Sequence, residues 1–335
     1  MAPNILLVRF SAIGDILLTT PLIRALRARH PAARITYVTR SAFVPLLAHN
    51  PHLTEVIGWE PGTPISALAG RLKGAGFTHQ LDLHGSLRSR LLRWRVGGRW
   101  SGYPKHRVPR AVLIRTKRDT YRDPRPVAER YFDAAADLDV QPDGGSAQCF
   151  LSAASTRDAE RFLEASDIGL SRQLIALAPG AAHATKRWPA HHWTELSHRL
   201  IGMGNDLVVL GSPEDAGLAE QLSPAFRGRG ASAAGRFDLA GTAALLRRAR
   251  ALISGDTGVM HLATAVGTPV VALFGPTVER FGFFPYRAKA TVVQKDLSCR
   301  PCSAHGSAEC PLKHHRCLQD LMPEDVLEAL RKLPR

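Results

Sequence analysis

A buried strand that runs through a glycine-containing turn into a helix opens the chain. The sequence predicts a strand over residues 4–10, a helix over residues 16–29 and a second strand at Arg34–Thr39, just after the helix-stopping Pro31. Strand, helix and strand at this spacing form a βαβ unit, which implies a parallel sheet covered by helices on both faces. Two further strands are predicted in this half, at Glu55–Trp59 and His79–Leu83.

The same alternation restarts after a polar, glycine-rich stretch at residues 141–146. Because 335 residues exceed what one hydrophobic core usually supports, we predict two domains, residues 1–155 and 170–320. A final helix, within residues 321–335 and starting at Pro323, either stays with the second domain or crosses back to the first. The second half is predicted to contain helices 156–166, 191–202, 213–222, 242–248 and 258–266, and strands 174–178, 206–210, 251–254 and 269–274.

The predicted fold class is therefore α/β, with two Rossmann-like, doubly wound parallel-sheet domains facing across a cleft. In such folds ligands bind beyond the carboxyl ends of the strands. Each polar motif discussed below follows directly after a predicted strand. We therefore expect these motifs to line the binding site.

Positive charge is concentrated in the first half of the chain. The formal net charge is +15, and residues 86–118 contain 11 Lys or Arg and no Asp or Glu, with Trp94, Trp100 and Tyr103 among them. A field of this sign attracts nucleic acid, an anionic membrane surface or a phosphorylated acceptor. Aromatic residues among arginines also suit single-stranded nucleic acid. Charge alone does not choose among these partners.

Targeting signals are missing from the sequence. The N-terminus lacks the basic, apolar and small-residue regions of a signal peptide, and no apolar run is long enough to span a membrane. The sequence therefore predicts a cytoplasmic protein.

Asp15 places a carboxylate on the turn between the first strand and the first helix. Gly14 stands alone there, so the segment is neither a dinucleotide fingerprint nor a phosphate-binding P-loop. A carboxylate in this position can act as a general base toward a sugar hydroxyl. It can equally cap the helix, which Asp does often. Both interpretations stay open at this point.

A second motif, Pro179 to Pro189, follows the strand at residues 174–178 and presents Lys186 and Arg187 just before a helix. An ammonium is a compact charge that suits a diphosphate, and a guanidinium adds a fork of donors. The alternative for Lys186 is a solvated loop residue. We expect Trp188 to be structural and to pack on the following helix.

The strongest motif is Leu252 to Ala263, a buried strand followed by a polar turn and a helix start. Thr257 and Gly258 would present backbone N–H groups at a helix N-terminus, which is a ready anion site. His261 lies one turn further on the same side. Asp256 is unfavourable next to phosphates and is expected to accept a hydroxyl or to orient N–H groups. The structural alternative is a helix cap with a core histidine.

Glu214 follows another predicted strand, in Gly211-Ser212-Pro213-Glu214. A carboxylate at this position is a candidate for binding the vicinal hydroxyls of a ribose. Acidic residues are also common at helix N-termini because they interact favourably with the helix dipole. The pattern does not decide between these two roles.

Four of the five cysteines gather near the C-terminus: Cys299, Cys302, Cys310 and Cys317. Four thiolates, two of them in a Cys-x2-Cys pair, can hold a tetrahedral zinc ion. Their spacing does not match the common zinc ribbons or fingers, so a set of reduced cytosolic thiols is the alternative. A structural zinc is thus one of two predictions for this segment.

Three motifs, in this order, resemble those of glycosyltransferase family 9, the ADP-heptose:lipopolysaccharide heptosyltransferases. They are Ser-x-x-Gly-Asp-x-x-x-Thr-x-Pro from Ser11, Pro-Gly-Ala with Lys-Arg-Trp-Pro from Pro179, and Asp-Thr-Gly-x-x-His-Leu-Ala from Asp256, followed by Leu273-Phe274-Gly275-Pro276-Thr277. The Cys-rich tail with His315 resembles the heptosyltransferase II-like branch. The chain departs from the first branch at Ala181–Ala184, where that branch has Thr and acidic residues.

The resemblance implies a GT-B fold and an inverting transfer of heptose from ADP-heptose to a hydroxyl of the lipopolysaccharide inner core. It implies that no metal is required for catalysis. It implies an acceptor, the phosphorylated lipid A–core oligosaccharide, bound by the N-terminal domain, and a nucleotide-sugar bound by the C-terminal one. The roles that the resemblance implies are catalytic base for Asp15 and donor binding for Lys186, Asp256, Thr257, Gly258 and His261. From the motifs themselves, we also expect Arg187 and Glu214 to bind the donor. The residues expected to bind the acceptor are Ser11, Gly14, His84, Arg88 and Arg90.

Two rival functions remain. One is another GT-B transferase or epimerase with a different nucleotide-sugar, which a panel of donors would separate. The other is a nucleic-acid-binding module, which would lose binding when Arg88, Arg90 and Arg93 are neutralised but not when Lys186 is. We expect no nucleic-acid partner. Attachment to the anionic surface of the inner membrane is expected from the basic first half.

Overall fold

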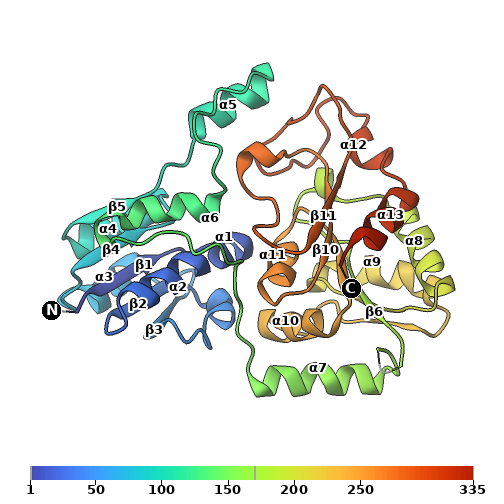
Figure 1. Cartoon of the computed structure of the whole chain (residues 1–335), viewed down its shortest axis with the longest axis horizontal. Coiled ribbons are helices and arrows are strands. Elements are labelled where there is room, and N and C mark those ends of the chain that lie inside the picture. The colour runs from blue at the N-terminus through green and yellow to red at the C-terminus, as the bar shows by residue number, and fades with distance from the viewer. Residues whose placement is uncertain (1, 170, 335) are drawn as a thin grey trace. The chain divides into compact units, whose positions relative to one another are not determined.

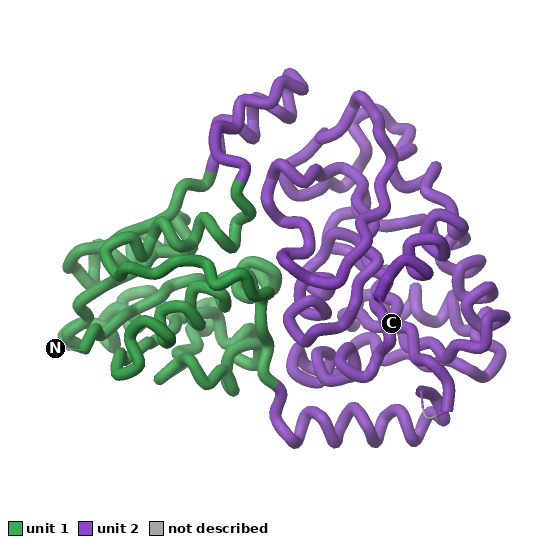
Figure 2. The backbone as a smooth tube through the Cα atoms, viewed as in Figure 1, with its two compact units in different colours: residues 1–105, 125–150 green, residues 106–124, 151–335 purple. Residues whose placement is uncertain are grey.

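The computed structural model of the chain describes residues 2–169 and 171–334. The chain forms two compact units, drawn in different colours in Figure 2. Unit 1 contains residues 1–105 and 125–150, and unit 2 contains residues 106–124 and 151–335. Both units contain one parallel sheet with helices around it, so the predicted α/β class with two parallel sheets is confirmed.

Unit 1 is built on a five-stranded sheet with the order β3-β2-β1-β4-β5 (Figure 1). Every pair of neighbouring strands is parallel, and β1 lies at the centre, with Val8 opposite Val38 of β2 and Asp82 of β4. Apolar side chains such as Leu6, Val8 and Phe10 form part of its core. The strands are β1 (Asn4–Val8), β2 (Arg34–Arg40), β3 (Glu55–Trp59), β4 (His79–Asp82) and β5 (Trp100–Gly102).

Unit 2 contains a six-stranded parallel sheet with the order β11-β10-β9-β6-β7-β8. Its central strands are buried along their whole length, as apolar runs in a two-sided parallel sheet should be. The strands are β6 (Leu174–Ala178), β7 (Asp206–Val209), β8 (Gly230–Ser232), β9 (Ala251–Gly255), β10 (Val270–Phe274) and β11 (Ala290–Gln294).

Helices pack around these sheets, except α5, which extends away from them (Figure 1). Unit 1 has α1 (Ile13–Leu17), α2 (Thr20–Arg29), α3 (Ile65–Leu72), α4 (Leu87–Val96) and α6 (Val127–Arg130). Unit 2 has α5 (Arg107–Thr116), α7 (Ala153–Ala165), α8 (Ala190–Gly202), α9 (Ala216–Leu222), α10 (Leu239–Arg248), α11 (Gly258–Ala265), α12 (Arg316–Gln319) and α13 (Pro323–Lys332). None of the helices in the described part of the chain is both long and apolar enough to cross a membrane.

Residues 106–124 belong to unit 2, although the sequence analysis placed them in the N-terminal domain. Side-chain contacts between this segment and the rest of unit 2 explain why it belongs there. Arg110 of α5 stacks over the ring of Phe281 at 5.5 Å, and Lys117 donates to the carbonyl of Pro301 at 2.6 Å. Asp119 pairs with Arg280. Such contacts join positions far apart in the sequence, so no local pattern could predict them.

One helix prediction needs correction, and for the final helix the structure decides between the two alternatives. The single helix predicted over residues 16–29 is divided into α1 and α2, because Leu18 and Thr19 cap the two pieces and Pro21 lies in the first turn of the second. The final helix α13 does not cross back to the first unit. It contacts α8, β10 and β11 in unit 2, where Val326 and Leu330 join the core.

Candidate functional site

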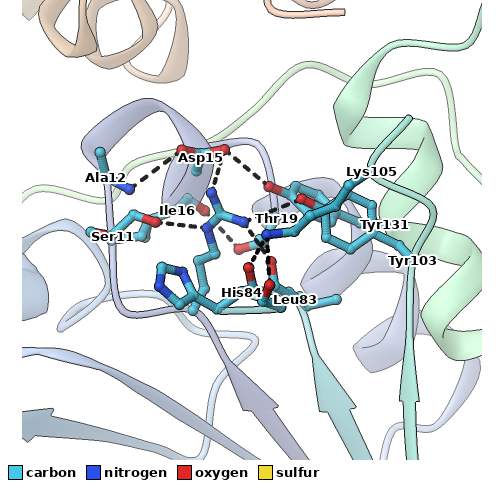
Figure 3. Close-up of polar contacts among 12 residues, drawn as sticks. Ser11, Ala12, Asp15, Ile16, Thr19, Leu83, His84, Tyr103, Lys105 and Tyr131 are labelled. Carbon is cyan, nitrogen blue, oxygen red and sulfur yellow. Dashed lines mark hydrogen bonds and ion pairs between the residues drawn. The ribbon is translucent and has the colours of Figure 1, made fainter. Parts of the chain in front are cut away.

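Asp15 is the third residue of α1, just beyond the carboxyl end of the central strand β1. Its Oδ1 lies 2.5 Å from Nη2 of Arg9 and 3.4 Å from the hydroxyl of Tyr131, which donates to it (Figure 3). Its Oδ2 accepts from the backbone N–H of Ala12 at 3.4 Å. The carboxylate therefore caps the first turn of α1 and also forms an ion pair. The capping role is present, and it leaves the role of catalytic base untested.

Arg9, which directly follows β1, pairs with Asp15 and supports this arrangement. The sequence analysis did not single out Arg9. Its guanidinium is buried and donates to the carbonyls of Ser11 at 2.7 Å and Leu83 at 2.5 Å. Burial lowers the pKa of Arg9, but the Asp15 carboxylate together with the nearby Tyr131, Tyr103 and Tyr37 more than offsets this, so the pKa lies above its ordinary value. The sequence did contain a signal for this role, an arginine at the end of an otherwise apolar strand. A charge that is buried there requires a partner of opposite charge.

We expect Arg9→Met to lower the free energy of unfolding by about 3 kcal/mol, because it leaves the Asp15 carboxylate without its cation. Urea denaturation at neutral pH measures this. The Arg29→Met variant is the control, since Arg29 and Asp139 form a pair whose side chains are 57% and 79% exposed. That surface pair should contribute no more than about 1 kcal/mol. Equal losses in the two variants would contradict the buried role of Arg9.

His84 lies beside Arg9, directly after Leu83. Burial, followed by the charges of Arg9 and Lys105, lowers the pKa of His84 to about 4, so its imidazole is neutral at physiological pH. Its ring meets the ring of Phe10 edge-on at 5.4 Å. Lys105 donates to the carbonyl of His84 (Figure 3). His84 is thus brought to the same edge of the sheet as Asp15.

The other residues predicted to bind the acceptor are spread over this end of unit 1. The carbonyl of Ser11 accepts from Arg9, and Gly14 is buried inside α1. Arg88 is exposed at the start of α4 and stacks over the ring of Trp59 at 4.9 Å. Arg90 is exposed on the same helix. The structure thus groups Ser11, Gly14 and His84 around Asp15 and places the two arginines on the surface of α4.

Lys186 and Asp256 form the corresponding centre of unit 2. Nζ of Lys186 lies 2.6 Å from Oδ2 of Asp256 and donates to the backbone carbonyl of the same residue at 3.0 Å. Asp256 also accepts from the hydroxyl of Thr277 at 2.7 Å, so it takes a hydroxyl as the sequence analysis expected. An ammonium has three N–H donors, and these two contacts leave one for a ligand. Thr277 was not singled out as a site residue.

The start of helix α11 lies next to this pair. Thr257 is the N-cap residue in an extended conformation, and Gly258 is the first residue of the helix. Its first-turn N–H groups have no acceptor within the helix, which is the geometry of an anion site. The hydroxyl of Thr257 lies 3.1 Å from that of Ser254. His261 is buried one turn further along, as the structural alternative predicted.

Arg187 and Trp188 follow Lys186 but differ in role. Nε of Arg187 donates to the carbonyl of Ala181 at 2.8 Å, across its own loop. Trp188 is buried, donates to the carbonyl of Leu321 at 2.8 Å and stacks on His192 of α8. The structural role predicted for Trp188 is confirmed.

Glu214 is exposed in the short 3-10 helix Pro213–Asp215 that follows β7, and the hydroxyl of Ser212 lowers the pKa of its carboxyl group. The neighbouring Asp215 packs differently. Its carboxylate accepts from the N–H of Ser212 at 2.9 Å, and a Cβ on Gly180 would lie only 2.2 Å from it. Asp215 is therefore the carboxylate that lies against the glycine after β6. The donor-binding role of Glu214 remains a prediction from the sequence.

The cysteine cluster contains four free thiols, of which Cys317 is buried. The thiols of Cys299 and Cys310 are near enough to affect the ionisation of Cys302, and burial first and then these neighbours raise its pKa. Within residues 2–169 and 171–334, no three His, Cys, Asp or Glu side chains are arranged as ligands of a metal ion. The structural zinc thus remains a prediction from the sequence.

Comparison with known proteins identifies the family. The model of glycosyltransferase family 9 (heptosyltransferase) matches residues 65–313. Lipooligosaccharide heptosyltransferase 2 of Haemophilus influenzae is 27% identical over 98% of this chain and 99% of its own length. Lipopolysaccharide heptosyltransferase 2 of Salmonella typhimurium is 28% identical over 98% of both.

Solved structures agree with the sequence match. The structure of E. coli ADP-heptose lps heptosyltransferase II superposes with a TM-score of 0.77 at 27% identity, over 98% of this chain and 97% of that one. A family 9 glycosyl transferase from Veillonella parvula reaches a TM-score of 0.83 at 24% identity, over 98% and 96%. The two parallel sheets described above thus form the GT-B fold of these enzymes. The chain belongs to glycosyltransferase family 9, the heptosyltransferases.

Proposed function

We propose that this enzyme transfers heptose from ADP-heptose to a hydroxyl of the phosphorylated lipopolysaccharide inner core, with inversion at the anomeric carbon. The names of two relatives support these substrates. The name of the Salmonella typhimurium relative contains lipopolysaccharide, and that of the E. coli structure contains ADP-heptose. The observation that carries the chemistry is Asp15, a carboxylate fixed by a buried arginine at the carboxyl end of the central strand. Unit 1 binds the acceptor in this proposal, and unit 2 binds the donor.

The reaction is a single displacement. The acceptor oxygen attacks the anomeric carbon, its proton passes to the carboxylate of Asp15, and the bond from that carbon to the phosphate oxygen breaks. ADP leaves with the bonding electron pair. Lys186 and the N–H groups at the start of α11 stabilise the charge that develops on the diphosphate, which is the largest electrostatic contribution available here. Because a side-chain cation and backbone amides do this, the transfer requires no metal ion.

Release of ADP tests the proposal. ADP-heptose is incubated with a heptose-deficient lipopolysaccharide, and UDP- and GDP-sugars are compared as donors. We expect release that depends on the acceptor, is specific for ADP-heptose and persists in the presence of a metal chelator. Equal use of other nucleotide-sugars would favour a different GT-B transferase. Absence of release across a panel of truncated acceptors would rule out the proposed substrates.

The enzyme also binds the anionic cytoplasmic surface of the inner membrane in this proposal, through α4. The side chains of Leu87 and Trp94 are 83% and 77% exposed on this helix, among exposed arginines. Exposed Trp and Leu next to arginines are typical of helices that lie in a membrane interface. Each basic residue near such a surface contributes about 1 kcal/mol of binding.

Sedimentation with phosphatidylglycerol vesicles at low salt measures this binding. Arg90→Ser with Arg95→Ser should reduce the partition coefficient roughly thirtyfold, which corresponds to two such charges. Arg247→Ser with Arg331→Ser, exposed arginines of unit 2, is the matched control. Equal loss in both pairs, or no sedimentation of the native protein, would contradict attachment through α4.

A further inference from the structure

The cysteine-rich segment, residues 299–317, lies against the loop that carries Lys186 and against the loop whose Thr277 is hydrogen-bonded to Asp256. One of these loops follows β6 and ends in Thr185 and Lys186, and the other follows β10 and contains Thr277. All three pieces belong to unit 2. Their mutual hydrogen bonds connect a segment of no assigned role to the centre of the candidate donor site.

The first connection is made by Thr185, which is buried next to Lys186. Its backbone N–H donates to the carbonyl of Ser307 at 3.2 Å, and its hydroxyl donates to the same carbonyl at 3.0 Å. The N–H of Ser307 in turn donates to that hydroxyl at 2.8 Å. Nε2 of His315 lies 3.0 Å from the carbonyl of Thr185. Both backbone polar groups and the side chain of Thr185 are thus bonded to the cysteine-rich segment.

The second connection is made by Arg300. Its guanidinium donates to the carbonyls of Gly275 at 2.5 Å and Thr277 at 2.8 Å. The N–H of Cys302 donates to the carbonyl between them, that of Pro276, at 3.1 Å. The segment therefore fixes three successive residues of the loop after β10. Because the hydroxyl of Thr277 is bonded to Asp256, this loop carries the restraint to the carboxylate that pairs with Lys186.

The loops after β6 and β10 also pack closely against each other. A Cβ on Gly275 would lie 2.9 Å from Cγ of Leu318 and 3.3 Å from the carbonyl oxygen of Thr185. The loops after β6 and β10 thus approach each other closely at Gly275, beside Leu318, which directly follows the segment. The positions of Lys186 and Asp256 depend on these packed connections as well as on their own strands.

We propose that the cysteine-rich segment is a brace of the diphosphate site, in which Thr185 and Arg300 are positioning residues for Lys186 and Asp256. This inference rests on the proposed function, since it takes the Lys186 centre to be the site of the donor diphosphate. Preorganised charges stabilise a ligand most when they need not reorganise on binding. A brace of this kind makes the order of residues 299–317 and the affinity for ADP mutually dependent.

Thr185→Val tests the brace with little change in side-chain volume. It removes the hydroxyl that donates to and accepts from Ser307, and we expect the Kd for ADP to rise about tenfold in calorimetry. Thr185→Ser keeps the hydroxyl and should restore the Kd to within about threefold of the native value. Thermal unfolding of both variants shows whether the units remain folded. Because ADP binding is measured directly, the result does not depend on the identity of the sugar or acceptor.

Lys186→Ala, measured in parallel, distinguishes failure of the proposed function from failure of the brace alone. If Lys186→Ala binds ADP as the native enzyme does, the donor role of this centre is wrong, and with it the proposed function of the lysine. If Lys186→Ala weakens binding while folded Thr185→Val does not, only the brace is wrong. Loss in both, with rescue by Thr185→Ser, supports the brace.

Hydrogen exchange provides a second test, because ADP would not change the exchange of this segment if Thr185 had only a structural role. Saturating ADP should slow exchange of the amides in residues 303–311 in the native enzyme, since coupling between two sites is reciprocal. This protection should disappear in Thr185→Val at an ADP concentration raised to keep the site occupied. Exchange in that range that is indifferent to ADP in the native enzyme would overturn the inference.

Discussion

Asp15→Asn is expected to slow acceptor-dependent release of ADP about a thousandfold while ADP still binds with its native Kd. The amide keeps the size of the carboxylate and an oxygen that faces Arg9, but it does not take a proton from the acceptor hydroxyl at neutral pH. Release of ADP measures the rate, and calorimetry measures the Kd. The unchanged nucleotide affinity follows because Asp15 belongs to unit 1, whereas the candidate donor site belongs to unit 2.

A suitable control is Asp139→Asn, which alters an exposed carboxylate of the same unit that also pairs with an arginine. It should leave the rate unchanged. Because Asn at position 15 weakens the pair with Arg9, urea denaturation must show that the variant is folded under the assay conditions. A folded Asp15→Asn enzyme with the native rate would remove Asp15 from the mechanism and leave it as a helix cap held by Arg9.

Lys186→Met is expected to lower kcat/KM for the donor by about two to three orders of magnitude, because the site loses the cation that offsets the leaving diphosphate. The loss is enlarged by Asp256, whose carboxylate pairs with Lys186 at 2.6 Å and would then face the phosphates without a counter-charge. Steady-state kinetics with varied ADP-heptose measure the effect.

Adding Asp256→Asn to Lys186→Met should therefore recover part of the lost kcat/KM, which distinguishes charge from simple loss of volume. Lys295→Met is the matched control, since this lysine of unit 2 pairs with Asp325 of α13. Arg187→Met should have a smaller effect, because its guanidinium is bonded to the carbonyl of Ala181 in its own loop. A larger loss in Arg187→Met than in Lys186→Met would assign the diphosphate to Arg187.

Local sequence patterns predicted the elements of the fold well where an apolar run is bounded by turn residues. The strands at Glu55–Trp59 and Leu174–Ala178 have the predicted bounds, and the helix predicted to begin at Gly258 does so. The strands β5, β8 and β11 were not predicted. Each is short or only partly buried, as Trp100–Gly102 illustrates, so the apolar signal that marks central strands is weak there.

The site was predicted residue by residue but not as a set of contacts. Lys186 and Asp256 were both singled out, but their ion pair joins positions far apart in the chain. The two residues come together because the strands that precede them, β6 and β9, are neighbours in the sheet. Arg9 and Thr277, although Thr277 ends one of the motifs, were not assigned to the site, because each acts by bonding to another side chain. Such supporting residues follow from tertiary packing, which spacing in one sequence does not encode.

The excursion of residues 106–124 limits how this enzyme can be divided into working parts. Because the chain enters unit 2 at residue 106, returns to unit 1 at residue 125 and leaves again after residue 150, no single cut separates the two units. A fragment ending at residue 150 would carry α5 without the partners of Arg110 and Lys117. A hybrid enzyme that exchanges acceptor units between relatives must therefore take residues 106–124 from the parent that supplies unit 2.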